Sequence, residues 1–316
     1  MNEDRSPEAL DESQTAADTT VFVLGGGGNL GAVQVGMLQA LLESGARPDA
    51  IIGTSIGALN GAFLAGHCDV EGLRELADLW ASVRRHDVFP MNPRSLTRGV
   101  FGHQQYLFES LGLRSLLSRA RFGFDRLEDA PITLSVMATD LETGEAVELA
   151  EGDTITSLLA SAAIPGVFPP VGIQDRVLID GGVVANVPIA EAALLEPSRI
   201  YVLPTVPEDS TRQPGNAIVM MQHAMALAAK PGFRRDLVEA SARSTVQVLP
   251  VPAAASHLSI FDFHATQRLI NESYELAIDW LEGKSSRDGS EVFSSARSAV
   301  GNVVPKSQTS PSPALA

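Results

Sequence analysis

The sequence is poor in cysteine and in positive charge, and each shortage excludes a class of protein. Only one of its 316 residues is a cysteine, Cys68, so an internal disulfide cannot form, which fits a reducing compartment. Lysine and arginine number 23 against 38 aspartates and glutamates. The resulting formal net charge of -15 argues against nucleic acid as a partner, and against attachment of the whole surface to an anionic membrane.

Long hydrophobic runs are also missing. No apolar stretch reaches the ~20 residues of a membrane span, and residues 1–20 lack the basic and apolar regions of a signal peptide. We therefore expect a cytoplasmic protein, in contact with a membrane at most peripherally. Residues 1–18 are polar and acidic, and residues 284–316 are rich in serine and proline, so both are expected to be disordered tails. Between them, residues 19–283 are expected to form one domain.

The most informative stretch is residues 50–61, AIIGTSIGALNG. An apolar run typical of a buried strand ends in Gly53-Thr54-Ser55-Ile56-Gly57, and a helix of small residues follows. This G-x-S-x-G pattern is typical of a nucleophile elbow, in which a sharp strand-to-helix turn exposes a serine hydroxyl. A side chain at either glycine would collide with a neighbouring element in so tight a turn. The pattern alone also fits a glycine-rich turn with an incidental serine, so other segments must decide the role of Ser55.

A second glycine-rich loop lies one βα unit earlier, between a predicted strand at 19–24 and a predicted helix at 32–44. Its G-x-G-x-x-G spacing matches a dinucleotide-binding fingerprint. The acidic residue expected at the end of the following strand is absent, however, and no lysine follows the glycines as a P-loop requires. We therefore favour an oxyanion hole made of backbone N–H groups beside the elbow. The loop consists of Gly26, Gly27, Gly28, Asn29, Leu30 and Gly31.

Asp180 is the second candidate for chemistry. It ends a short apolar strand predicted at 176–179 and is followed by Gly181 and Gly182. A plain Asp-Gly turn is the simpler interpretation of this pattern. A serine nucleophile, however, needs a base within hydrogen-bond reach, and partial burial would raise the low basicity of an ordinary aspartate.

The order of the predicted elements indicates an α/β fold with a parallel or mostly parallel sheet. Further strands are predicted at 132–139, 146–149, 200–203 and 244–251, and further helices at 71–83, 157–163, 214–242 and 266–281. In the helix at 214–242 we expect four apolar side chains to lie in the core: Met220, Met221, Met225 and Leu227.

Residues 83–126 differ from the rest of the chain, because basic and aromatic residues are concentrated there. The simpler interpretation is a helical insertion with solvated arginines. The alternative is a cap that contacts lipid headgroups through arginines and aromatic rings. The segment contains Arg84, Arg85, Arg94, Arg98, Arg114, Arg119, Arg121 and Arg126, with Phe89, Phe101, Tyr106, Phe108, Phe122 and Phe124.

With these residues identified, the chain resembles the patatin-like phospholipase family over roughly residues 20–205. The resemblance implies a three-layer α/β/α fold and a metal-independent lipid acyl hydrolase of the phospholipase A, lysophospholipase or carboxylesterase type. It also implies that Ser55 is the nucleophile, Asp180 the base and the 26–31 amides the oxyanion hole, with no cofactor. Its motifs are the loop at 26–31, the elbow at 53–57, Asp180-Gly181-Gly182, and two stretches typical of bacterial members, TDLETGE at 139–145 and AIPGVFPP at 163–170.

The sequence departs from the family pattern at one position and leaves other functions open. The family usually has a basic residue where this loop has Leu30. A Ser–His–Asp hydrolase is an alternative that needs a histidine after the acid, for which His257 is the credible candidate. A lipid-binding protein without turnover is another alternative, and a nucleotide-binding module is the least favoured. The substrate and the oligomeric state are not written in the sequence.

Overall fold

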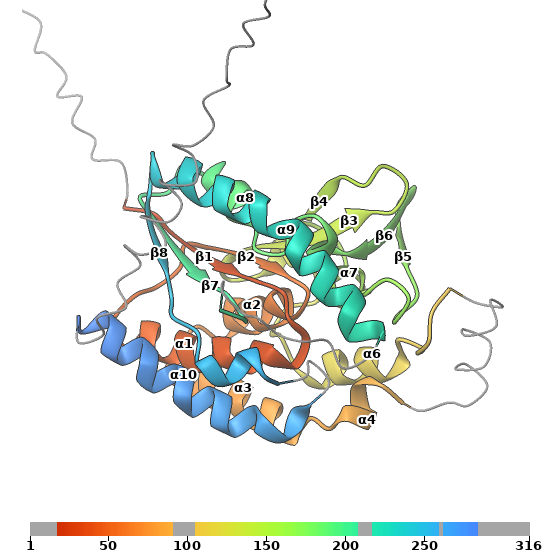
Figure 1. Ribbon diagram of the computed structural model, residues 1–316, viewed down its shortest axis with the longest axis horizontal. Helices are drawn as coiled ribbons and strands as arrows, with labels where there is room; N and C mark the ends of the chain where they lie inside the picture. The colour runs from red at the N-terminus through yellow and green to blue at the C-terminus, as the bar shows by residue number, and fades with distance from the viewer. Residues whose placement is uncertain (1–17, 91–104, 208–216, 259–261, 284–316) are drawn as a thin grey trace, which may run out of the picture.

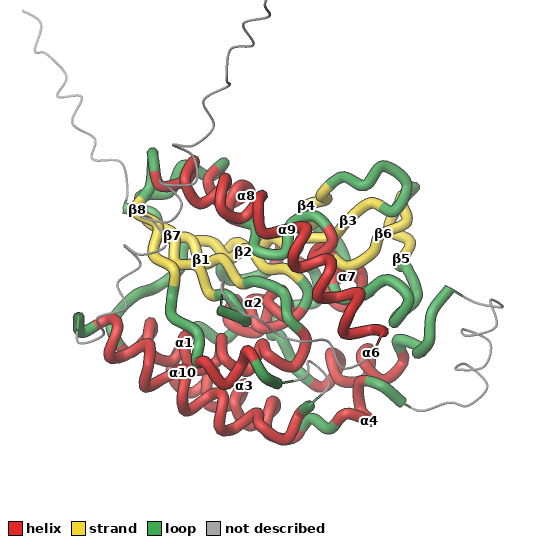
Figure 2. The backbone as a smooth tube through the Cα atoms, viewed as in Figure 1, coloured by secondary structure: helices red, strands yellow, loops and turns green. Residues whose placement is uncertain are grey.

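The computed structural model describes residues 18–90, 105–207, 217–258 and 262–283. The two predicted disordered tails lie outside these ranges, apart from Asp18. Figure 1 shows a central sheet with helices on both faces, as the sequence predicts. Figure 2 shows the strands as one continuous layer between the two layers of helices.

The sheet has eight strands among the described residues, in the order β5-β6-β3-β2-β1-β7-β8, with β4 also paired to β3. The five strands β3, β2, β1, β7 and β8 are parallel to one another, whereas β4 and β6 run antiparallel to β3, and β5 runs antiparallel to β6. The strands are β1 (Thr20–Leu24), β2 (Ala50–Thr54), β3 (Thr133–Asp140), β4 (Ala146–Leu149), β5 (Val171–Ile173), β6 (Arg176–Asp180), β7 (Arg199–Leu203) and β8 (Thr245–Val248).

Helices cover both faces of this sheet (Figure 1). On one face lie α1 (Ala32–Glu43), α2 (Ile56–Gly66), α3 (Val70–Ser82) and α10 (Thr266–Leu281); on the other lie α8 (Ile189–Ala193) and α9 (Ala217–Ser241). Near the β5–β6 end are α4 (Arg85–Val88), α6 (Leu111–Arg119) and α7 (Thr154–Ser161). Short 3-10 helices complete the described chain: η1 (Gly28–Gly31), η2 (Leu127–Asp129), η3 (Gly181–Val183), η4 (Ala253–Ser256) and η5 (Phe263–Ala265).

The alternation of side chains along each strand divides the core in two. In β1, Phe22 and Leu24 pack with the large cluster under α1 and α2, whereas Val21 and Val23 pack with the smaller cluster under α8 and α9. Successive side chains of a strand point to opposite faces, so a strand that is apolar throughout must be covered on both. The continuous apolar runs of the sequence are therefore explained by the two layers of helices.

The prediction of a core role for the apolar residues early in α9 is wrong. Met220 is 53% exposed and Leu227 is 49% exposed, while Met221 and Met225 are half-buried. Among the side chains of α9 that the structure describes, those that contribute to the core come from Phe233 onward. The periodicity of a helix identifies apolar positions, but which turns are covered depends on how far the helix extends beside its neighbours.

The aromatic and the basic side chains of residues 83–126 lie in different environments. The rings of Phe89, Phe108 and Phe122 are buried in the core, so the idea that they contact lipid headgroups is wrong. The arginines in the described part are exposed: Arg84, Arg85, Arg114, Arg119, Arg121 and Arg126. Arg94, Arg98 and Phe101 lie outside the described residues. The short helices α4 and α6 fit the simpler interpretation of a helical insertion.

Within the described ranges, none of the helices combines the length and the apolar character needed to cross a membrane.

Candidate active site

Ser55 occupies a strained turn between β2 and α2. Its backbone has φ 54 and ψ -121, and it is the N-cap residue of α2. A positive φ is uncommon for a residue other than glycine and is typical of functional turns. A Cβ on Gly57 would lie 2.2 Å from the carbonyl oxygen of Leu24, and one on Gly53 would lie 2.6 Å from Ala58 Cα. Both positions therefore exclude a side chain, as the sequence predicts.

The hydroxyl of Ser55 donates a hydrogen bond to the carboxylate of Asp180, with 2.7 Å between Oγ and Oδ2. The other carboxylate oxygen accepts a bond of 2.7 Å from the backbone N–H of Gly182. A Cβ on Gly181 would lie 2.4 Å from the carbonyl oxygen of Met137, so this glycine lets the chain turn against β3. The structure thus brings together the two side chains that the sequence analysis singled out.

Burial changes the acidity of Asp180. The residue is only 5% exposed, and this desolvation raises the pKa of its carboxyl from 3.8 to about 6. The hydrogen bonds from Ser55 and Gly182 oppose the shift because they stabilise the charged form. The carboxylate is therefore more basic than an exposed aspartate, yet still ionised at neutral pH.

The glycine loop lies beside the elbow and is held by the surrounding backbone. Gly26 N–H donates to Asn186 O at 2.9 Å, and Leu30 N–H donates to Gly27 O at 3.3 Å. The hydroxyl of Thr205 donates to Gly26 O at 2.6 Å. Three amides of the loop donate to none of the described residues: those of Gly27, Gly28 and Asn29. Since they open the 3-10 helix η1, they lack partners within it.

Leu30, where the family usually has a basic residue, lies fully buried in the core of this protein. Its neighbour Asn29 is also buried: its Nδ2 donates to the backbone carbonyl of Asp262, and its Oδ1 has no partner among the described residues. The loop is thus fixed to the core by an apolar side chain.

A chain of buried polar side chains that the sequence did not reveal holds the carbonyl groups at the two ends of the loop. Trp80 Nε1 donates to Asn60 Oδ1 at 2.9 Å, and Asn60 Nδ2 donates to Gln34 Oε1 at 2.9 Å and to Gly31 O at 3.0 Å. Gln34 Nε2 in turn donates to Gly25 O at 2.8 Å. The only hint in the sequence was the presence of amide side chains, such as Gln34 and Asn60, within two apolar helices.

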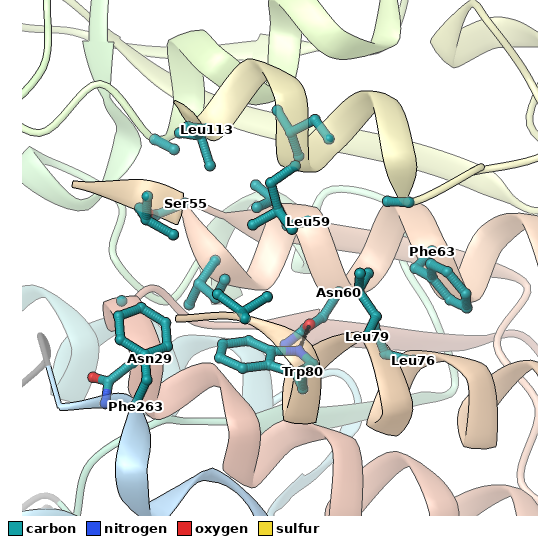
Figure 3. Close-up of a pocket in the computed structure, with 18 of the residues that line it drawn as sticks. Asn29, Ser55, Leu59, Asn60, Phe63, Leu76, Leu79, Trp80, Leu113 and Phe263 are labelled. Carbon is teal, nitrogen blue, oxygen red and sulfur yellow. Dashed lines mark hydrogen bonds between the residues drawn. The ribbon is translucent and has the colours of Figure 1, made fainter. Parts of the chain in front are cut away.

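An apolar cavity begins at Ser55 and extends along α2. Figure 3 shows Ser55, Leu59 and Phe63 following one another on this helix, with Trp80 and Leu79 opposite. Residues four apart lie on one face of a helix, so Ser55 and Phe63 are separated by ~12 Å along its axis. Other apolar side chains complete the wall: Leu76, Val83, Val88, Phe89, Leu113, Leu116, Leu117, Phe122, Ile164, Phe168 and Phe263.

Among the described residues, no histidine takes part in the contact between Ser55 and Asp180. His257 follows η4, His223 lies within α9 and His264 within η5. In the part of the chain that the structure describes, no histidine hydrogen-bonds to Ser55 or Asp180, and none lines the cavity. Among the same residues, no group of three His, Cys, Asp or Glu side chains could hold a metal ion.

The fold and the site define a class, the α/β proteins that carry a serine at a strand-to-helix elbow. The chain belongs to the patatin-like phospholipase family, whose model matches residues 22–193.

Several proteins of this kind are similar in sequence. An NTE family protein of Mycobacterium tuberculosis is 29% identical over 60% of this chain and 49% of its own length. Lysophospholipase NTE1 of Scheffersomyces stipitis is 30% identical over 54% of this chain and 10% of its own. Patatin-like phospholipase domain-containing protein 7 of Rattus norvegicus is 32% identical over 53% of this chain and 12% of its own. The chain thus matches about half or less of each relative.

Two solved structures are also similar. VipD from Legionella pneumophila has a TM-score of 0.39 and 16% identity, covering 90% of this chain and 75% of VipD. ExoU from Pseudomonas aeruginosa, in complex with SpcU, has a TM-score of 0.40 and 16% identity, covering 85% of this chain and 53% of ExoU.

Proposed function

We propose that this protein is a carboxylic ester hydrolase that cleaves fatty acyl esters of lipids with Ser55 and Asp180. The observation that carries the proposal is the 2.7 Å hydrogen bond between the elbow serine and a buried carboxylate, at the start of an apolar cavity. Membership of the patatin-like phospholipase family supports a lipid substrate. The relative named as a lysophospholipase supports the same class.

The chemistry follows from the two side chains. Asp180 accepts the Ser55 proton as Oγ attacks the ester carbonyl, and that proton then leaves with the alcohol or lysolipid. An acyl-enzyme remains on Ser55. In the second half of the reaction Asp180 takes a proton from water, whose oxygen attacks the acyl carbonyl. The bond to Ser55 Oγ then breaks, Asp180 returns the proton to Oγ, and the fatty acid is released. A carboxylate with a pKa of about 6 is ionised at neutral pH and basic enough to assist both steps.

The negative charge of the tetrahedral intermediate needs fixed donors. The predicted oxyanion loop, residues 26–31, contributes the amides of Gly27, Gly28 and Asn29 in this proposal, because those of Gly26 and Leu30 already donate to backbone carbonyls. Since the donors are backbone groups, Leu30 in place of a basic residue leaves them intact. The remaining motif residues, among them Thr54 and Gly182, shape the turns on which the two side chains lie.

The cavity suits a single acyl chain. Its wall is apolar along the ~12 Å from Ser55 to Phe63, so a chain bound there would leave its ester carbonyl at Ser55. Burial of methylene groups supplies about 0.8 kcal/mol each, which favours substrates whose acyl chain fills the cavity.

A direct Ser–Asp pair is favoured over a Ser–His–Asp triad. In a triad the histidine lies between the serine and the acid, whereas here the carboxylate contacts the hydroxyl itself. His257 therefore has no step in the proposed reaction.

We also propose that the exposed arginines near α4 and α6 let the protein contact a membrane surface transiently. Arg84, Arg85 and Arg114 are exposed, and Leu111, the first residue of α6, is 71% exposed. Cations and an apolar side chain together favour the headgroup region of anionic lipids. Replacing Arg84 and Arg85 by glutamate should weaken flotation with anionic liposomes; unchanged flotation would remove this contact.

The test of the reaction uses a medium-chain p-nitrophenyl ester and then a panel of lipids, with chelator present. Ser55→Ala and Asp180→Asn should lose hydrolysis, while His257→Ala should keep it. Loss in His257→Ala as well would favour a triad. No hydrolysis by the folded wild-type protein would favour a lipid-binding protein of the same fold.

A further inference from the structure

The end of α7 holds the backbone of the proposed nucleophile. Ser161 Oγ accepts a hydrogen bond of 2.8 Å from Ser55 N–H and donates one of 2.5 Å to the carbonyl of Met137, inside β3. Its side chain is fully buried. One hydroxyl therefore connects three elements: the elbow, β3 and the last residue of α7.

The same stretch holds the proposed base. Two residues after Ser161, the carbonyl of Ala163 accepts a bond of 3.0 Å from Asp180 N–H. The carbonyl of Asp180 accepts another 3.0 Å bond from Thr139 Oγ1 on β3. The backbones of both reacting residues are thus fixed to one short segment, and their separation depends on it.

The elbow requires such support. Ser55 has a positive φ. A residue in such a strained conformation keeps it only where several interactions with the surrounding structure hold it there. The bond from its N–H to Ser161 resists relaxation of that backbone, and so keeps Oγ directed at Asp180.

We propose that Ser161 is a positioning residue for ester hydrolysis, which sets the placement of Ser55 relative to Asp180 without touching the substrate. The inference rests on the proposed function of the site. If it holds, removing the Ser161 hydroxyl slows the chemical step, because a misplacement of ~1 Å in a catalytic group costs on the order of 100-fold in rate.

The experiment compares Ser161→Ala and the nearly isosteric Ser161→Cys with a matched control, Ser157→Ala. Ser157 lies one turn earlier in α7 and is buried, but its hydroxyl forms no hydrogen bond among the described residues. Hydrolysis of a p-nitrophenyl ester gives kcat and KM, a fluorophosphonate titration counts reactive serines, and thermal unfolding gives Tm. Ser55→Ala gives the background rate of hydrolysis without the proposed nucleophile.

We expect kcat per reactive serine to fall about 10- to 100-fold in Ser161→Ala and less in Ser161→Cys, with KM unchanged in both. Ser157→Ala should keep the wild-type kcat. The pH profile gives a second readout. The hydrogen bond from Ser55 lowers the pKa of Asp180, so loss of that bond should move the acid limb of activity to higher pH.

A lower Tm with unchanged kcat in Ser161→Ala and Ser161→Cys would show a structural role only and overturn the proposal. An equal loss of kcat in Ser157→Ala would also overturn it. If Ser161→Ala does not fold, the proposal is tested with Ser161→Cys alone, by its kcat and by the acid limb of its pH profile. Full turnover by Ser55→Ala would instead overturn the proposed function, and with it the role of Ser161.

Discussion

Ser55 and Asp180 are separated by 125 residues in the chain, and their side chains lie 2.7 Å apart in the fold. Ser55 follows β2 and Asp180 ends β6, and both strands pair with β3. Because β4 occupies the other edge of β3, β2 and β6 lie end to end along the same edge. The register explains their proximity: Met137 of β3 is opposite Thr54, and the next residue, Ala138, is opposite Asp180. The antiparallel β6 thus ends where β2 ends, on the same edge of β3, and its terminal carboxylate faces the elbow directly.

The pKa of Asp180 predicts how activity depends on pH. As the proposed base, Asp180 must be ionised, so kcat/KM should fall with decreasing pH along a limb whose midpoint is about 6. Below that midpoint the loss should approach tenfold per unit of pH. The measurement is hydrolysis of a neutral ester across the pH range in which the protein remains folded. A midpoint near the ordinary value of an aspartate would contradict the assignment.

The same shift predicts a stability effect of Asp180→Asn. The folded-state pKa is raised above 3.8, so the folded protein binds a proton more tightly than the unfolded chain, and wild-type stability falls as pH rises from about 4 to about 6. Asparagine carries no such charge. We therefore compare the unfolding free energy of the variant with that of wild type at each pH. This difference should shift in favour of the variant by up to ~3 kcal/mol between low and neutral pH. Urea unfolding at both pH values tests this, and a pH-independent difference would refute it.

Gly57→Ala should disrupt the elbow. The new Cβ would lie 2.2 Å from the backbone carbonyl of Leu24, which cannot move without disturbing β1. We expect a loss of about 1–3 kcal/mol in stability and of most activity. Gly172→Ala is the matched control, since a Cβ there meets nothing within 4 Å and its φ is not positive. Equal effects of the two substitutions in thermal unfolding and hydrolysis would contradict this explanation.

The buried chain of Trp80, Asn60 and Gln34 should contribute to stability. Asn60→Ala leaves Trp80 Nε1 without its acceptor and removes both donations toward Gln34 and Gly31, at a cost of about 2–4 kcal/mol. Trp80→Phe should cost less, about 1–3 kcal/mol, because only one bond is lost. The control is Trp280→Phe on α10, where the indole is half-buried and forms no hydrogen bond among the described residues. Denaturant unfolding should rank the three variants in this order.

Leu59→Trp should change the preferred acyl length. Leu59 lies on α2 between Ser55 and Phe63 and lines the cavity, so a larger side chain there would shorten the space beyond Ser55. Hydrolysis of a dodecanoate ester should fall at least about tenfold relative to a butyrate ester, which needs little of the cavity. An unchanged ratio of kcat/KM for the two esters would show that the acyl chain binds elsewhere.

The sequence by itself determined the local features. The predicted helix at 266–281 coincides with α10, because its apolar residues recur at helical spacing and are covered on one face. The need for glycine at Gly53 and Gly57 also follows from the sharpness of a strand-to-helix turn. Runs of apolar residues, alternating with helices, were sufficient to predict a mostly parallel sheet. The catalytic roles of Ser55 and Asp180 stay predictions.

Only the tertiary structure decided how these segments meet. Ser161 is 106 residues from Ser55 in the chain, and its bond to the elbow depends on how α7 packs against β3. The exposure of Met220 depends likewise on where the helices beside α9 end. Periodicity reports the local backbone and the apolar face of an element, but a hydrogen bond between distant side chains depends on strand register and packing.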